Sequence, residues 1–300
     1  MEAPQLRPLG VGDIVDRVFA LYRSRPLMFL AVAAVPYLLL FVVIAGLGLA
    51  FATSLVALGG PLADIAAGRV PDLAAPSMRA AIVTAVALAI VSGVLAIVIL
   101  SAQSAGLIAA TSSLYLRRPV GAGEAFREGL RAAPRIIGAS ILVFLIVVVL
   151  WIALGVVLVL ANQAIVFALG ILFGFVAMIY IFASTLVAPV VATLEHAGPM
   201  TALRRSWWLS DGSRWRIIGL QLLLLVLNAV IGALLSALFL GSFISDVTAR
   251  TIVQQVANLV TNVAWAPVQW GTFAVLYYDL RVRREAFDLQ LAAEALPREP

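Results

Sequence analysis

The sequence predicts an all-α integral membrane protein with six transmembrane helices. The helices are arranged as three hairpins, each preceded by a cytoplasmic amphipathic helix, in a pseudo-threefold internal repeat. Three observations predict this fold class: long runs without charge, arginines clustered between those runs, and short motifs that recur. Hydrophobic residues make up 63% of the chain and charged residues 12%, whereas soluble domains carry about 25% charged residues.

Long uncharged runs define the predicted spans. Five runs contain no charged residue: 26–63, 80–116, 136–194, 217–245 and 251–278. About 20 apolar residues suffice for a helix to cross the hydrocarbon core. The run 136–194 would form a helix of roughly 90 Å, about three cores long, so it divides at Asn162-Gln163. The six predicted spans are approximately 27–52, 80–111, 136–161, 164–192, 217–240 and 253–278.

The arginines set the predicted orientation. Seventeen of the 20 basic residues lie in four clusters, at 7–25, 117–135, 204–216 and 281–298. With six spans, all four clusters fall on one side, and only Arg69, Arg79 and Arg250 fall on the other. The positive-inside rule then places both termini in the cytoplasm. The composition, which has arginine but no lysine and is rich in alanine and valine, favours a bacterial cytoplasmic membrane.

Recurring motifs predict a repeated unit, which is an amphipathic helix followed by two spans. Arg135-Ile136-Ile137-Gly138 returns as Arg216-Ile217-Ile218-Gly219, and Ala188-Pro189-Val190 returns as Ala266-Pro267-Val268. Matches at corresponding places indicate an internal repeat. We expect one six-span domain over 1–290, with units at about 9–118, 119–198 and 199–284, and a cytoplasmic tail over 291–300.

The amphipathic stretches have two interpretations. They either lie in the inner headgroup layer, with arginines towards the phosphates, or form a platform that docks a partner protein. The first interpretation makes membrane lipids the partners, and it explains the arginines better than nucleic acid does. The predicted headgroup contacts are Arg17, Arg117, Arg118, Arg135, Arg204, Arg205, Arg216, Arg281, Arg283 and Arg284.

A polar stripe marks the sixth predicted span. Its members recur at steps of three and four residues, which places them on one helical face: Gln255, Asn258, Asn262, Trp265, Gln269 and Thr272. Such side chains in a membrane usually form hydrogen bonds between helices. The alternative is that they line one wall of a hydrated cavity or substrate path.

The sequence offers little for catalysis. It contains no cysteine and a single histidine, His196, beside Glu195. The predicted spans contain no Asp, Glu, His, Lys or Arg, and the chain has no phosphate-binding loop and no cluster of metal ligands. We therefore expect no enzyme activity, cofactor or metal.

Both ends of the chain resemble a known family. Arg7-Pro8-Leu9-Gly10-Val11-Gly12-Asp13-Ile14-Val15-Asp16-Arg17 is similar to the opening of the membrane domain of glycerophosphoryl diester phosphodiesterases. The segment from Tyr277 to Leu289 is similar to its close. In members with the full name, a separate soluble barrel carries the catalytic residues. The resemblance implies a stand-alone membrane domain without that barrel, so no catalytic residue is carried over.

Two functions remain after these steps. The first is a non-catalytic scaffold or accessory subunit for an envelope or lipid-related process. The second is a transporter or channel for a small neutral or amphiphilic solute, which would use the stripe. The absence of charge within the spans favours the scaffold, whereas internal repeats are common in transporters.

Overall fold

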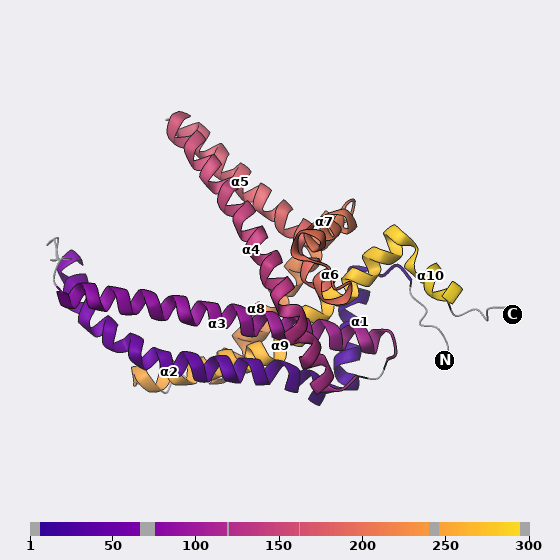
Figure 1. Cartoon of the computed structure of the whole chain (residues 1–300), viewed down its shortest axis with the longest axis horizontal. Coiled ribbons are helices and arrows are strands. Elements are labelled where there is room, and N and C mark those ends of the chain that lie inside the picture. The colour runs from indigo at the N-terminus through magenta and orange to yellow at the C-terminus, as the bar shows by residue number, and fades with distance from the viewer. Residues whose placement is uncertain (1–6, 67–75, 119, 162, 240–245, 295–300) are drawn as a thin grey trace. The chain divides into compact units, whose positions relative to one another are not determined.

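The computed structural model describes residues 7–66, 76–118, 120–161, 163–239 and 246–294. Every regular element in these ranges is a helix, and none of the described residues forms a strand. The elements, drawn in Figure 1, are α1 (Val11–Ser24), α2 (Pro26–Ala66), α3 (Pro76–Tyr115), α4 (Ala122–Ala161), α5 (Ala164–Thr185), α6 (Ala188–Leu194), α7 (Pro199–Ser210), α8 (Arg214–Phe239), α9 (Val247–Glu285) and α10 (Phe287–Glu294).

Five helices in the described part of the chain are long and apolar enough to cross a membrane. They are Pro26–Leu47, Met78–Tyr115, Ala122–Ala161, Ile165–Leu194 and Arg214–Ala237. The chain is therefore an α-helical, multi-pass membrane protein. The predicted sixth span lies within α9, whose polar stripe lowers its mean hydropathy, so the count of six spans stays a prediction.

Several helix boundaries differ from the predicted spans. α2 and α3 extend into residues 53–79, which the sequence predicts as a loop between the first two spans: α2 continues to Ala66 and α3 begins at Pro76. The amphipathic stretch expected before the third predicted span is not a separate helix but the first turns of α4, which continues through Pro134. The fourth predicted span is divided, since α5 ends at Thr185, where the ring of Pro189 would clash with the carbonyl four residues earlier.

The chain divides into two compact units. The first contains the residues up to Ala33 together with those from Ser101 onwards, and the second contains residues 34–100. The second unit holds most of α2 and the first part of α3, and many of its large side chains, such as Val42 and Val83, are exposed. Exposed aliphatic side chains of this kind suit contact with lipid.

The core of the first unit surrounds the last turns of α9. Phe273–Leu280 are all buried there, and they pack with buried residues of α1, α6 and α8 such as Ile14, Val190 and Ile217. Gln103, in the buried end of α3, donates a hydrogen bond of 2.7 Å to the carbonyl of Ala33. The core is thus built from segments far apart in the sequence.

α4 and α5 form an antiparallel pair whose contact depends on glycine. Figure 1 shows the two helices side by side. A Cβ atom added to Gly170 would meet Leu158, and one added to Gly174 would meet Leu154 and Trp151. The spacing Gly-x-x-x-Gly lets helices approach closely in a membrane. The boundary between the two helices lies at the predicted polar break, with α4 ending at Ala161 and α5 beginning at Ala164.

Candidate functional site

Asp279 is the centre of a buried polar clamp. Its side chain has no exposed surface. One carboxylate oxygen accepts a hydrogen bond of 2.7 Å from the amide of Leu9, and the other pairs with Arg216 and with Arg283, the latter at 3.0 Å. Both arginines also donate to the carbonyl of Leu9, at 2.6 and 2.9 Å. The clamp therefore holds the segment before α1 against α8 and α9, with the carboxylate charge compensated.

A second cluster joins α7 to the end of α9. Arg205 contacts Glu195 at 3.1 Å and Glu285 at 2.5 Å. Glu285 also pairs with Arg281 at 2.7 Å, and the hydroxyl of Tyr277 donates to Glu195 at 2.7 Å. Burial raises the pKa of Glu285, but the hydrogen bonds from Arg281 and Arg205 outweigh burial and leave that pKa below its ordinary value.

A third cluster surrounds Asp211, directly after α7. Its carboxylate accepts 2.7 Å and 2.8 Å bonds from Arg284 and Arg214. Hydrogen bonds from Arg284 first, and then from Arg214, lower the pKa of Asp211. Arg214 also donates to the hydroxyl of Ser184 at 2.8 Å, so this cluster links α5, α7, α8 and α9.

The predicted headgroup arginines fall into two groups. Five take part in the clusters just described, namely Arg205, Arg216, Arg281, Arg283 and Arg284. Among the other five, Arg117, Arg118 and Arg204 are exposed, and Arg17 lies 6.0 Å from the ring centre of Tyr115. One terminal nitrogen of Arg135 is buried and has no hydrogen-bond partner among the described residues. Sequence patterning did not reveal which arginines pair with carboxylates.

The polar stripe does not share one environment along α9. Gln255, Asn258 and Asn262 are exposed, whereas Trp265 and Thr272 are buried. The hydrogen bonds of the stripe remain within α9. The side chain of Asn262 donates to the carbonyl of Asn258 at 2.7 Å, and the hydroxyl of Thr272 donates to the carbonyl of Val268 at 2.7 Å.

Gln269, the remaining member of the stripe, lines a cavity. This cavity, of about 350 Å³, is also lined by Ser140 of α4, Thr185 of α5 and Phe182. It is the place where the stripe meets polar side chains of other helices. The arrangement suits an apolar or amphiphilic ligand with a few polar atoms.

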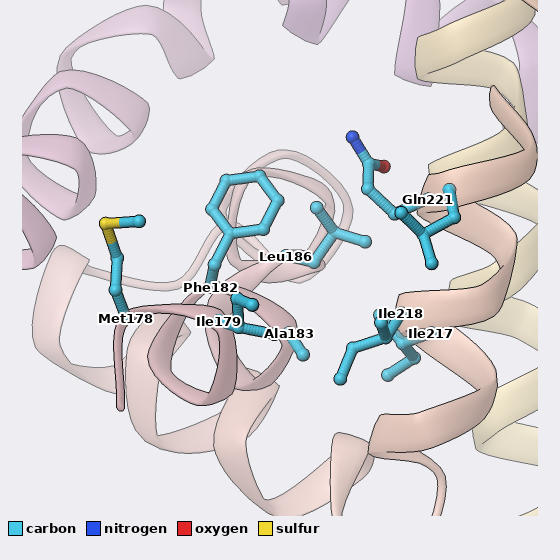
Figure 2. A pocket seen from close by; sticks show the side chains of 9 residues that line it. Met178, Ile179, Phe182, Ala183, Leu186, Ile217, Ile218 and Gln221 are labelled. Carbon is cyan, nitrogen blue, oxygen red and sulfur yellow. The ribbon is translucent and has the colours of Figure 1, made fainter. Parts of the chain in front are cut away.

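A second cavity adjoins the first across Phe182 and Leu186, which line both. Its volume is about 260 Å³, and it lies between α5 and α8. Figure 2 shows Phe182 and Leu186 on one side and Ile217 and Gln221 on the other. The side-chain oxygen of Gln221 is buried and has no hydrogen-bond partner among the described residues. Gln221 was not among the predicted site residues, although an amide in the leucine-rich run of the fifth predicted span is a detectable signal.

No metal centre is present among the described residues, because no three His, Asp or Glu side chains come together in a way that could hold an ion. His196 lies between α6 and α7, with a positive φ of 54°, and its side chain is 3.3 Å from Glu128 of α4. Its side chain is 61% exposed. This pair joins α4 to the turn before α7.

No protein-family model matches the chain, and neither a curated protein nor a solved structure matches it. The family resemblance of the two ends therefore rests on the residues quoted for it.

Proposed function

We propose that the chain is a non-catalytic scaffold or accessory subunit for an envelope or lipid-related process in a bacterial cytoplasmic membrane. The observation that carries this proposal is that Asp279, Glu285, Glu195 and Asp211 are each paired with arginine. In each pair the guanidinium groups compensate the charge of the carboxylate and connect it to a different helix or loop. The clusters therefore serve to fasten helices together.

Contacts among the four arginine clusters support six spans with both termini in the cytoplasm. Arg216 and Arg283, from the third and fourth clusters, both contact Leu9 in the first. Arg25 of the first cluster donates to the carbonyl of Val120 in the second. Segments that touch in this way lie on the same side of a membrane, as the positive-inside argument requires.

The two segments that resemble the membrane domain of glycerophosphoryl diester phosphodiesterases meet in the clamp, where Leu9 of the opening segment contacts Asp279 and Arg283 of the closing one. A direct role in joining the ends explains why both segments would share a pattern with that family. We propose that the chain is a relative of that membrane domain, arranged as three repeated hairpin units.

A conduit for a small neutral or amphiphilic solute is the second candidate. The two adjoining cavities favour it, because they place Gln269 and Gln221 near the shared residues Phe182 and Leu186. A solute path requires these cavities to be hydrated, whereas a scaffold requires only a well-packed site.

Thiol labelling separates the two functions, since the chain has no cysteine of its own. The Gln269→Cys variant is treated in liposomes with a membrane-impermeant thiol reagent. Thr272→Cys is the control at a buried position, and Asp246→Cys is the control at a solvent-exposed position. For a scaffold we expect Gln269→Cys to react as slowly as Thr272→Cys. Labelling of Gln269→Cys as fast as that of Asp246→Cys contradicts the scaffold and supports the conduit.

A further inference from the structure

A third hollow of the first unit differs from the two cavities because charged and aromatic side chains surround it. It has a volume of about 610 Å³ and lies between α4, α5 and α7. Ile146 and Ile181 form an apolar wall, and Tyr180 and Trp207 stand beside Arg204 and Arg214. We refer to this hollow as the arginine groove.

Arg214 is held rigidly in the groove. It donates to Ser184 and to Asp211, both at 2.8 Å. Its guanidinium carbon lies 4.6 Å from the ring centre of Tyr180 and 5.4 Å from that of Trp207. Contacts with the two aromatic rings, together with the two hydrogen bonds, fix the orientation of the guanidinium group before any ligand binds. Its second terminal nitrogen makes no hydrogen bond within the described residues, so this donor is available to a ligand.

Arg204 adds a second positive charge. Its side chain is exposed and forms no ion pair with the part of the chain that the structure describes. The acidic residue of the groove, Asp211, is shared between Arg214 and Arg284. The groove and its immediate partners therefore keep an excess of positive charge, and an anion is the complementary ligand.

We propose that the arginine groove binds an anionic phospholipid from the leaflet on the arginine-rich side of the membrane. The phosphate group contacts Arg204 and the free donor of Arg214, and an acyl chain lies along Ile146 and Ile181. Tyr180 and Trp207 suit this position, because tyrosine and tryptophan prefer the depth of the headgroups. A free phosphate ion would use the arginines but leave the apolar wall without a ligand. This site goes beyond the proposed scaffold function and does not depend on it.

The test is a titration of the full-length protein in detergent with dioleoyl phosphatidylglycerol, followed by native mass spectrometry. Dioleoyl phosphatidylcholine is the zwitterionic comparison. The main variant is Arg204→Gln, because this residue has no ion pair to lose. The matched control is Arg127→Gln, an exposed arginine of α4 that is not part of the groove. Arg214→Lys keeps the charge but removes the planar fork.

We expect phosphatidylglycerol to bind more tightly than phosphatidylcholine. One lost arginine contact near a membrane surface corresponds to about fivefold weaker binding, so Arg204→Gln should lose about this factor for phosphatidylglycerol alone. Arg214→Lys should also weaken binding, and Arg127→Gln should not. Equal affinity for the two lipids, or an equal loss in Arg127→Gln, overturns the proposal. Displacement of the lipid by inorganic phosphate also overturns it, since the site would then bind the free ion.

Discussion

The amide of Leu9 donates a 2.7 Å hydrogen bond to the carboxylate of Asp279, which lies 270 positions later in the chain. Two arginines complete the contact by donating to the carbonyl of Leu9. Both backbone groups of Leu9 are thereby satisfied, although the residue is 3% exposed. Leu9 and the carboxylate of Asp279 thus connect the segment before α1 to α9, beside the apolar contacts of Ile14 with the same core.

Asp279→Ala should destabilise the protein strongly. The change leaves Arg216 and Arg283 without their carboxylate partner and the amide of Leu9 without an acceptor. Breaking a buried ion pair costs about 3–5 kcal/mol, and because both arginines are partly exposed to solvent, we expect about 2 kcal/mol. Thermal unfolding in detergent measures the loss. Asp16→Ala, at an exposed position of α1, is the control and should change stability by less than about 0.5 kcal/mol.

The pH dependence of stability should include a contribution from Glu285. Its pKa is lowered in the folded state because the hydrogen bonds from Arg281 and Arg205 outweigh the effect of burial. A group with a lowered pKa stabilises the fold above its unfolded pKa of about 4.3, and the contribution is lost as the pH falls through the folded value. As the pH falls from 7 to 3, the melting temperature of the Glu285→Gln variant should therefore decrease less than that of the unsubstituted protein. Parallel curves for the two proteins contradict this assignment.

Gly129→Ala should disrupt the packing of α4 against the C-terminal half of α3. A Cβ atom at Gly129 would overlap the backbone at Ala102 and Gly106, and backbone atoms cannot move aside as a side chain can. Overpacking typically costs about 1–3 kcal/mol. Gly155→Ala is the matched control, because open space surrounds Gly155 on the same helix. There alanine should be neutral or stabilising, given its helix propensity. Equal melting temperatures for the two variants would refute the close contact between Gly129 and the backbone of α3.

Reporter fusions should test the proposed orientation. A reporter that is active only outside the cytoplasmic membrane should stay silent when fused after Asp211 and become active when fused after Asp246. The reason is that α8 lies between these positions and the arginine clusters favour the cytoplasmic side. A reporter at residue 300 should be silent because α9 returns the chain to the cytoplasm. Activity at residue 300 contradicts the sixth span.

Hydrophobic runs, and the polar residues that interrupt them, predicted much of the fold from sequence alone. The uncharged runs predicted long apolar helices, and the pair Asn162-Gln163 marked the boundary between α4 and α5. The lengths of α2 and α3 were underestimated, because the predicted spans were cut near the length that crosses a membrane although the uncharged runs 26–63 and 80–116 continue beyond them. Pro134 and Pro189 illustrate a further limit. Pro134 lies just before the third predicted span and Pro189 lies within the fourth, but α4 continues through the first and α5 ends before the second.

The identity of the polar partners was decided only by the tertiary structure. Arg204 and Arg205 are neighbours in a basic cluster, yet Arg205 is paired with Glu195 and Glu285 while Arg204 is exposed at the groove. Hydropathy and charge are properties of a segment, so the sequence by itself determined that the chain is helical and enters a membrane. Which carboxylate meets which arginine, and where cavities remain, depends on how segments distant in the chain pack, because these contacts form only when the helices are assembled.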